Sequence, residues 1–377
     1  MGSEITLHLG GLMLDYGKND SFINHSALFM SGDIEQADYH YAYGLIEHKP
    51  AFVRSLHSVV RRLDMLGYTL QDCERLYGDA VAETLSNDQP PLTFERFAEV
   101  IRGVDVGTIR ISSGDEGDDP GGITKLLGSS DFECLDRYVV LRLLAENPKN
   151  MDHKVIWEFA DVVDGGWVDK NDLYQGVSQR DRCLIVTEGS SDGKILQKAL
   201  SIVAPDVADF FDFVDMSEGY PFTGTGNLFR FCQGLASIKI QNRILIVLDN
   251  DTAGQVAFRQ ISKLNLPPRM RITMLPALEE CRNVRTLGPS GTQYEDINGR
   301  AVSIEWFLDT LIPEHPYPTI RWTSYNNELD AYQGELVDKK AYVRHFFDTV
   351  KRGSLYKLPK LEQLWDHMLA TCTNAVR

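Results

Sequence analysis

Two acidic residues follow an apolar segment in the middle of the chain. The segment 244–248 reads ILIVL, and Asp249 and Asp251 come directly after it, ahead of Gly254. Two carboxylates held this close repel each other unless a cation compensates them. Mg²⁺ suits that role, because it binds few protein oxygens and keeps waters for substrate phosphates. A plain strand-to-helix turn with Asp251 as the helix cap is the alternative interpretation.

A third acidic residue stands at the end of an earlier apolar segment. The segment 183–187 reads CLIVT, and Glu188 follows it. Gly189 permits a tight turn, and Asp192 opens the next predicted helix. In open α/β sheets, ligands bind at the carboxyl ends of the parallel strands. We therefore predict that Glu188 and the two aspartates converge if their strands are neighbours.

The elements that position these acids alternate between strand and helix. Such alternation is typical of βαβ units and a mostly parallel sheet. The predicted strands cover 183–187, 211–215, 244–248 and 271–275. The predicted helices between them cover 192–203, 227–237 and 253–264, and further helices are expected over 304–311, 339–349 and 360–371. This second domain is predicted to span 180–377, with a helical C-terminal extension.

The first domain is predicted to span residues 1–175 and to be mainly helical. Alternating Ile5, Leu7 and Leu9 indicate an N-terminal β-hairpin. Apolar residues then recur at helical spacing over 51–85, and more helices are expected over 93–101 and 131–145. Between these last two, the acidic stretch 112–122 (SSGDEGDDPGG) is expected to be a solvated loop.

Composition narrows the class of protein. The chain of 377 residues is 43% hydrophobic and 24% charged, which is ordinary for a globular protein. It contains neither an apolar run of about 18 residues nor a secretory signal, so a cytoplasmic protein without membrane contact is expected. Its six cysteines are scattered singly, which argues against a disulfide framework. A net charge of −16 disfavours broad electrostatic binding of nucleic acid, so such a surface would be local or belong to a partner.

The two acidic motifs together resemble a known domain. A Glu-Gly pair after the first strand, followed by Asp-x-Asp-x-x-Gly after a later one, resembles the Toprim domain of topoisomerases, DnaG-type primases and OLD-family nucleases. The resemblance implies a Rossmann-like Toprim fold that uses Mg²⁺ or Mn²⁺. It implies that Glu188 is the general acid and base and that Asp249 and Asp251 hold the metal. Gly189, Asp192 and Gly254 are then supporting residues.

Further segments resemble the bacterial HEPN/Toprim-associated proteins. On the N-terminal side these are GKND (17–20), HSALF (25–29) and RRLDMLGY (61–68). On the C-terminal side they are YEDINGRAVSIEWFLD (294–309), RWTSY (321–325) and YQGELVDKK (332–340). The resemblance therefore covers most of the chain. The Arg-x4–6-His motif of active HEPN ribonucleases does not occur, so that activity is not expected in the N-terminal domain.

In nucleases of the OLD type, a further acid and a lysine join the Toprim site. The matching residues here are Glu305, as a ligand of a second metal, and Lys339, as a charge that stabilises the transition state. The alternatives are that Glu305 is a first-turn helix acid and Lys339 a solvent-facing charge.

Two other segments have an open role. The stretch GTGN (224–227) precedes a predicted helix and either grips a phosphate or only connects elements. In RWTSYNNE (321–328), Trp322 and Tyr325 either stack on bases or belong to the core.

The resulting functional hypothesis is a metal-dependent nuclease that hydrolyses phosphodiester bonds of DNA or RNA, in bacterial antiphage defence. The defence role comes from the resemblance alone. One alternative is a non-catalytic Toprim module that binds nucleic acid or protein. Another is a nuclease toxin held inactive by a partner ATPase or sensor, since the chain has no Walker A sequence. A homo-oligomer is compatible with each of these.

Overall fold

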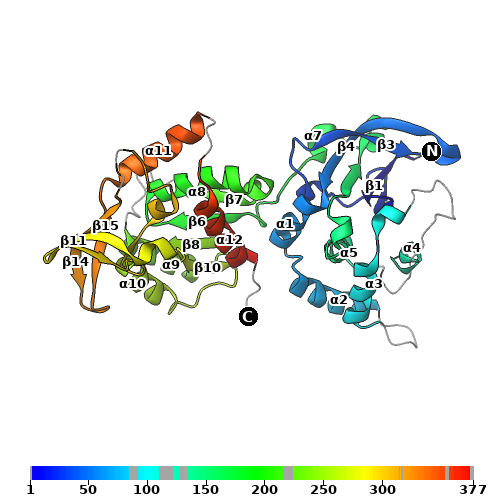
Figure 1. Cartoon of the computed structure of the whole chain (residues 1–377). Helices are drawn as coiled ribbons and strands as arrows, with labels where there is room; N and C mark the ends of the chain where they lie inside the picture. Colours follow the sequence, from blue (N-terminus) through cyan, green and yellow to red (C-terminus); the bar gives the residue numbers. More distant parts are fainter. Residues whose placement is uncertain are drawn as a thin grey trace. The chain divides into compact units, whose positions relative to one another are not determined.

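The chain divides into two compact units. The computed structural model describes residues 2–84, 92–109, 122–127, 132, 134–214, 224–313, 315, 317–352 and 356–373. The N-terminal unit is Met1–Ser178 and the C-terminal unit is Gln179–Val376 (Figure 1). Most of the predicted acidic loop, 112–121, and most of the turn before GTGN, 215–223, lie outside the described residues.

The N-terminal unit is built on a five-stranded antiparallel sheet. Its strands, in the order β2-β1-β5-β4-β3, are β1 (Glu4–Leu9), β2 (Leu12–Lys18), β3 (Ile34–His40), β4 (Ile46–Ser55) and β5 (Lys154–Glu158). The predicted N-terminal hairpin is present as β1 and β2. The sheet as a whole was not predicted. Its central strand β5 comes from far along the chain and pairs with both β1 and β4.

Helices pack against this sheet. They are α1 (Leu56–Leu66), α2 (Leu70–Thr84), α3 (Phe94–Gly103), α4 (Ile123–Leu127), α5 (Arg137–Leu144), α6 (Ala160–Asp164) and α7 (Lys170–Leu173). Short 3-10 turns lie at Ser26–Leu28, Ala42–Gly44, Val106–Thr108 and Pro148–Asn150. At the centre of the core, the ring of Phe52 in β4 stacks on Trp157 of β5. The predicted helical segment 51–85 therefore begins too early, because its first residues belong to a buried strand.

The C-terminal unit contains the predicted parallel sheet. The strands β6 (Cys183–Thr187), β7 (Phe211–Phe213), β8 (Arg243–Leu248) and β10 (Met270–Met274) lie in the order β10-β8-β6-β7, and all pairs are parallel. The strand order reverses between β6 and β8, because the chain moves to β7 on one side and later to β10 on the other. The carboxyl ends of these two neighbours therefore form a topological switch point, where open α/β sheets bind ligands.

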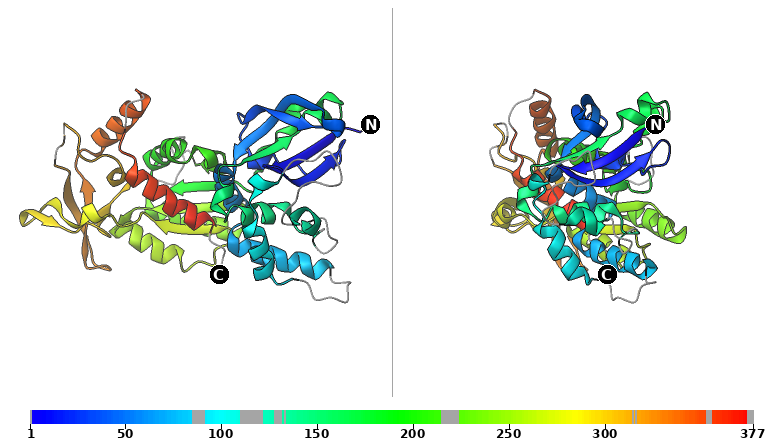
Figure 2. Two further views of the ribbon diagram at one scale, coloured as in Figure 1. Left: turned by 45° about the vertical axis from the view of Figure 1, so that its right-hand side comes forward. Right: turned by 90° about the vertical axis from the view of Figure 1, so that its right-hand side faces the viewer.

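Helices cover both faces of the parallel sheet (Figures 1 and 2). On one face, α9 (Thr225–Ser237) and α10 (Thr252–Ile261) bury Ile244, Ile246 and Leu248 of β8. On the other, α8 (Ser190–Val203) packs with the last helix, α12 (Pro359–Thr373). The mixed α/β architecture with a parallel sheet is thus as the sequence predicts. A continuous apolar strand needs cover on both faces, and the helices supply it.

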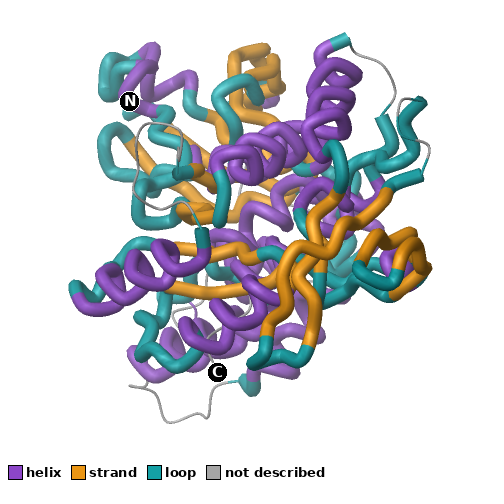
Figure 3. The backbone as a smooth tube through the Cα atoms, turned by 90° about the vertical axis from the view of Figure 1, so that its left-hand side faces the viewer, coloured by secondary structure: helices purple, strands orange, loops and turns teal. Residues whose placement is uncertain are grey.

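A second sheet follows the parallel one in sequence. Its order is β12-β11-β14-β15, with β11 (Val284–Gly288), β12 (Gly291–Glu295), β14 (Thr319–Asn326) and β15 (Ala331–Leu336). These strands are drawn as orange tubes in Figure 3. A two-stranded pair joins β9 (Asn250–Asp251) to β13 (Ala301–Val302). Short 3-10 helices span Pro205–Phe210, Glu279–Arg282 and Ile304–Phe307, and α11 covers Lys339–Lys351.

The predicted helical C-terminal extension is therefore only partly correct. Helices α11 and α12 lie where helices were expected, but residues 319–336 form strands. The cause is a weak local signal: β14 is mostly exposed, so its apolar alternation is incomplete. In the described part of the chain, no helix is both long and apolar enough to cross a membrane.

Candidate active site

Two of the predicted site residues meet at the switch point. Strands β6 and β8 pair in parallel with Thr187 opposite Val247, so the residues that follow them lie side by side. The backbone N–H of Asp249 donates to Oε1 of Glu188 at 3.1 Å. The strands that carry these acids are therefore neighbours, which is the condition on which the predicted convergence depends.

Asp251 is held by three groups at the start of α10. It caps the helix, and the backbone N–H of Gly254 donates to its Oδ1 at 2.7 Å. The side-chain amide of Gln333 donates to its other oxygen. The backbone of Asp251 also pairs with Ala301 in the short two-stranded sheet. The capping role and a role in ligand binding are thus compatible, because one carboxylate has two oxygens.

Gly254 is required by a close approach. A Cβ atom at this position would lie 2.0 Å from the carbonyl oxygen of Asp249, far inside van der Waals contact. The supporting role expected of this glycine therefore has a steric reason. Only glycine lets the first turn of α10 lie this close to the carbonyl of Asp249.

Gly189 and Asp192 form the corresponding turn after β6. The backbone N–H of Gly189 donates to Oδ2 of Asp192 at 3.0 Å, and the hydroxyl of Ser191 donates to Oδ1 at 3.1 Å. This bonding fixes the Asp192 carboxylate at the first turn of α8. The charge of Asp192 also helps to raise the pKa of Glu188, so the two carboxylates lie close together.

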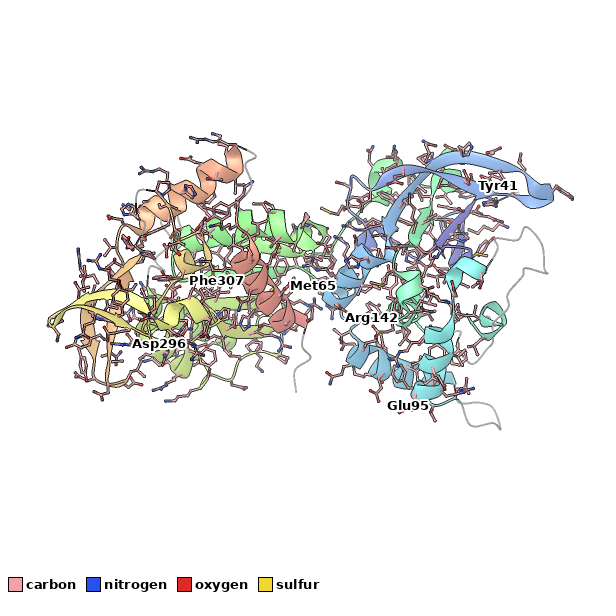
Figure 4. All side chains as sticks on the ribbon, viewed as in Figure 1. Tyr41, Met65, Glu95, Arg142, Asp296 and Phe307 are labelled. Atoms are coloured by element: carbon pink, nitrogen blue, oxygen red, sulfur yellow. The ribbon has the colours of Figure 1, made fainter. Side chains whose placement is uncertain are left out.

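Glu305 and Lys339 come from elements outside the parallel sheet. Glu305 lies in the 3-10 helix Ile304–Phe307, whose Phe307 is labelled in Figure 4. Its side chain is 3% exposed and accepts a hydrogen bond from the Ser303 hydroxyl at 2.6 Å. Lys339 is the first residue of α11 and is exposed. Glu305 is thus a first-turn acid of a short helix and Lys339 is an exposed charge, as the structural alternatives predict. Both residues also change the pKa of a nearby acid.

Mutual repulsion shows that five carboxylates share this region. Burial, followed by the charge of Asp251, raises the pKa of Glu188 from 4.5 to about 8. Burial, followed by the charge of Glu305, raises the pKa of Asp192 from 3.8 to about 6. Burial and the charges of Asp192, Glu188, Asp251 and Glu305 raise the pKa of Asp249 well above its usual range. These acids therefore cannot all ionise together at neutral pH without added positive charge.

The ammonium group of Lys339 partly offsets the repulsion among these acids. Lys339 lowers the pKa values of Asp192 and Asp251, although burial outweighs it in both cases. The N–H of Gly254 and the amide of Gln333 also work against the raised pKa of Asp251. A single exposed ammonium is too little to compensate five acids, of which Asp251 and Glu305 are buried.

The donors in the cluster suit a hard divalent cation. Carboxylate oxygens are the ligands that Mg²⁺ and Mn²⁺ prefer. In the part of the chain that the structure describes, no three His, Cys, Asp or Glu side chains are gathered closely enough to hold a metal ion. The arrangement therefore fits a cation bound by one or two carboxylates, with water and substrate oxygens completing its shell.

Gln333 is a site residue that the sequence did not predict. It lies in β15, donates to Asp251, and accepts hydrogen bonds from the hydroxyl of Thr252 and, at 3.1 Å, from the N–H of Ala253. No local pattern marks it, because its partners lie on another element of the chain. Only the folding of β15 beside α10 brings them together.

Comparison with known proteins bears on the N-terminal unit. Residues 1–181 match the family described as HEPN/Toprim N-terminal domain 1. No curated protein and no solved structure matches the chain significantly. The matched region contains the segments 17–20, 25–29 and 61–68 and ends just before β6. The match covers just under half of the chain and supports a HEPN/Toprim-type N-terminal domain in residues 1–181.

Proposed function

We propose that the C-terminal unit is a Toprim-type, metal-dependent hydrolase of phosphodiester bonds in nucleic acid. The observation that carries this proposal is the convergence of Glu188, Asp249 and Asp251 at the switch point of a parallel sheet. Raised pKa values in a crevice are typical of functional sites. The HEPN/Toprim match of the N-terminal unit supports the same function, because a Toprim domain then follows in the expected place.

The surroundings of each site residue suggest its role in the reaction. Asp249 and Asp251 would hold Mg²⁺ or Mn²⁺, and Glu305 is the candidate ligand of a second ion. An ion held there would supply a Lewis acid for the scissile phosphate and would lower the pKa of attacking water. Gln333 and the N–H of Gly254 fix the Asp251 carboxylate, so that its geometry is set before a ligand arrives.

Glu188 is suited to proton transfer. With a pKa raised to about 8, its carboxyl still carries a proton at neutral pH, when an ordinary glutamate has lost it. Proton transfer is most efficient when the pKa lies near the working pH. Lys339, being exposed at the rim, would neutralise phosphate charge as the substrate enters.

The proposed nuclease would be controlled by a partner protein. The chain contains no Walker A sequence, so energy-dependent control would come from a partner ATPase or sensor. An antiphage effector in bacterial cytoplasm would need such control, because an unrestrained nuclease is toxic. A non-catalytic binding module is the rival function. A binding role requires no group of repelling acids, whereas metal-dependent catalysis uses acids to hold the ion and to transfer protons.

The test compares charge-neutral variants with a matched surface control. Titration of Mg²⁺ and Mn²⁺ into the protein is followed by calorimetry, and cleavage is assayed on plasmid, single-stranded DNA and total tRNA. Glu188→Gln and Asp249→Asn should abolish cleavage, and Asp249→Asn should also weaken metal binding. Glu279→Gln should change neither, because the Glu279 side chain is 85% exposed and lies in the same unit.

Each other result has a definite meaning. Metal binding by the wild type without cleavage would favour the effector held inactive by a partner. Absence of both metal binding and cleavage would overturn the enzyme proposal and leave the binding module. Cleavage that survives both substitutions would place the catalytic centre elsewhere.

A further inference from the structure

The hairpin of β14 and β15 carries a cluster of aromatic rings. Tyr325 and Tyr332 are opposite each other in the register, with ring centroids 5.0 Å apart. Trp322 lies 6.2 Å from Tyr332 and is opposite Gly334. A Cβ atom at Gly334 would approach the Trp322 ring to 2.8 Å. Glycine at this position therefore lets the indole lie close against the neighbouring strand.

The indole ring of Trp322 is held in a fixed orientation. Its N–H donates to Oε2 of Glu295 at 2.9 Å, and the guanidinium of Arg300 lies 4.1 Å from its centroid. Arg300 also pairs with Glu295 at 3.3 Å. A ring fixed in this way loses little freedom when it binds a planar ligand.

The two tyrosine rings remain open to solvent. Tyr325 is 46% exposed and Tyr332 is 37% exposed. A tyrosine pair that served only the core would be covered, as Tyr39 and Tyr342 are in this protein. The exposed rings therefore present π-faces to a ligand, while the Tyr325 hydroxyl donates to the carboxylate of Asp330.

The aromatic cluster is joined to the acidic crevice at two points. Tyr332 is followed by Gln333, whose amide bonds to Asp251. The N–H of Gly334 donates to the carbonyl of Arg300 at 3.1 Å, and Arg300 in turn forms a backbone bridge with Asp251. The rings are therefore next in sequence to a residue that positions Asp251, but successive side chains of a strand point to opposite faces, so the Tyr332 ring and the Gln333 amide lie on opposite faces of β15.

We propose that Trp322, Tyr325 and Tyr332 form a stacking platform for the unpaired bases of a single-stranded nucleic acid. The inference rests on the proposed function, and it names the substrate class of the same site. Every base has a π-face, and stacking on an aromatic side chain contributes about 1–3 kcal/mol per base. A duplex hides those faces, so the platform selects single strands. The guanidinium of Arg300 lies over the Trp322 ring and covers that face, so Trp322 supports the platform and the exposed rings of Tyr325 and Tyr332 are the ones on which bases would stack.

The charge of the chain supports stacking as the source of affinity. With a net charge of −16, the protein has no general attraction for phosphate. Affinity that came mainly from phosphate contacts would fall steeply with salt. Binding through bases should instead depend weakly on salt concentration.

The test uses the full chain in EDTA, where no cleavage occurs. Anisotropy of labelled 20-nucleotide probes measures affinity for single-stranded DNA, single-stranded RNA, the matching duplex, and an abasic single strand. Tyr332→Ala and Tyr325→Ala should each weaken binding to single strands by about 5- to 100-fold. Tyr332→Phe should retain binding within about twofold, because it keeps the ring. The DNA and RNA arms show which sugar the site accepts.

A matched control lies on the same sheet. Tyr294 in β12 is 65% exposed and points to the opposite face in the strand register. Tyr294→Ala should leave binding unchanged. Thermal melting checks that each variant is folded. Equal binding by the alanine variants, tighter binding of duplex, or equal affinity for the abasic strand would overturn the platform.

The two proposals fail in distinguishable ways. Tyrosine-dependent binding by a protein that never cleaves would retain the platform and reject the catalytic role. Cleavage with an unchanged KM in Tyr332→Ala would reject the platform and retain the catalytic role. A wild-type protein that binds none of the probes would overturn the platform, and binding of a protein partner to the rings would then explain their exposure.

Discussion

Buried charge is arranged differently in the two units of this molecule. In the N-terminal unit, buried charges meet a partner of opposite sign. Arg142, which is labelled in Figure 4, donates to Asp64 at 2.9 Å and to Glu146 at 2.6 Å, and Lys49 donates to Asp161 at 2.8 Å. In the C-terminal unit, five acids share one crevice, with the exposed Lys339 as the cation that acts on them.

The two arrangements of charge have different effects on folding. Paired charges are compatible with a stable interior, whereas like charges in one crevice cost folding free energy. A group of acids that opposes folding persists when a ligand or a reaction requires it. The C-terminal unit should therefore be the more sensitive to pH and to divalent cations, and four predictions test this contrast.

The largest effect should be the pH dependence of the C-terminal unit. The pKa of Glu188 is raised from 4.5 to about 8, so between these values the folded state keeps a proton that the unfolded state has lost. Its contribution to stability is present below pH 4.5 and lost as pH rises to 8, with a slope of about 1.4 kcal/mol per pH unit. Hydrogen exchange of β6 and β8, corrected for intrinsic rates, measures this loss.

Two controls sharpen that measurement. Glu188→Gln should flatten the profile and stabilise the unit at pH 8, and added Mg²⁺ should do the same for the wild type. Stability of β6 and β8 that is independent of pH from 5 to 8 would contradict the contrast between the units.

The second effect is steric. Gly254→Ala places a methyl group 2.0 Å from the Asp249 carbonyl and should destabilise the C-terminal unit by about 1–3 kcal/mol. Gly234→Ala, in α9, meets no atom within 4 Å and should stabilise the unit by about 0.4–1 kcal/mol. Urea denaturation compares the two variants. Equal effects would mean that the tight turn is not needed.

The third effect concerns positioning. Gln333→Ala removes the amide that orients Asp251 and should lower cleavage by about 10- to 100-fold, as losses of supporting hydrogen bonds at metal sites do. Affinity for Mg²⁺ should fall with it, and the activity should recover in part at high Mg²⁺. Gln293→Ala, an exposed residue in β12, is the matched control. Full activity of Gln333→Ala would limit Gln333 to a structural role.

The smallest effect should be the pH dependence of the N-terminal unit. Burial and the charge of His40 lower the pKa of His8 from 6.5 to about 4. Burial raises the pKa of Glu158 from 4.5 to about 7. Both groups are thus neutral near pH 5.5, and their 3.6 Å approach is not an ion pair.

The two shifts oppose each other. As pH rises from about 4 to 6.5, the His8 contribution to stability increases, because the unfolded state loses a proton there and the folded state has already lost it. Between 4.5 and about 7, the Glu158 contribution decreases. Exchange of β1 and β5 should therefore vary little with pH. In Glu158→Gln, only the His8 contribution remains, so stability should rise with pH from about 4 to 6.5. Glu35→Gln is the control at an exposed site and should leave the pH dependence unchanged.

Local sequence predicts the elements of the parallel sheet well. The segments that form β6 and β8 are continuous apolar runs, and α8 and α10 begin with acids that cap or line their first turns. These signals lie within a few residues of each other. The acids Glu188, Asp249 and Asp251 could be proposed as a cluster for the same reason, because the ends of adjacent parallel strands meet.

The amino-acid sequence by itself determined where acids follow apolar strands and which segments alternate between strand and helix. Tertiary structure alone decided that β5 inserts between β1 and β4, and that Gln333 reaches Asp251. It also brings the thiols of Cys183 and Cys372 to 3.8 Å, although the cysteines are scattered singly in the sequence. The physical reason is range: propensity and periodicity act over a few residues, whereas these contacts depend on which distant surfaces the folded chain buries together.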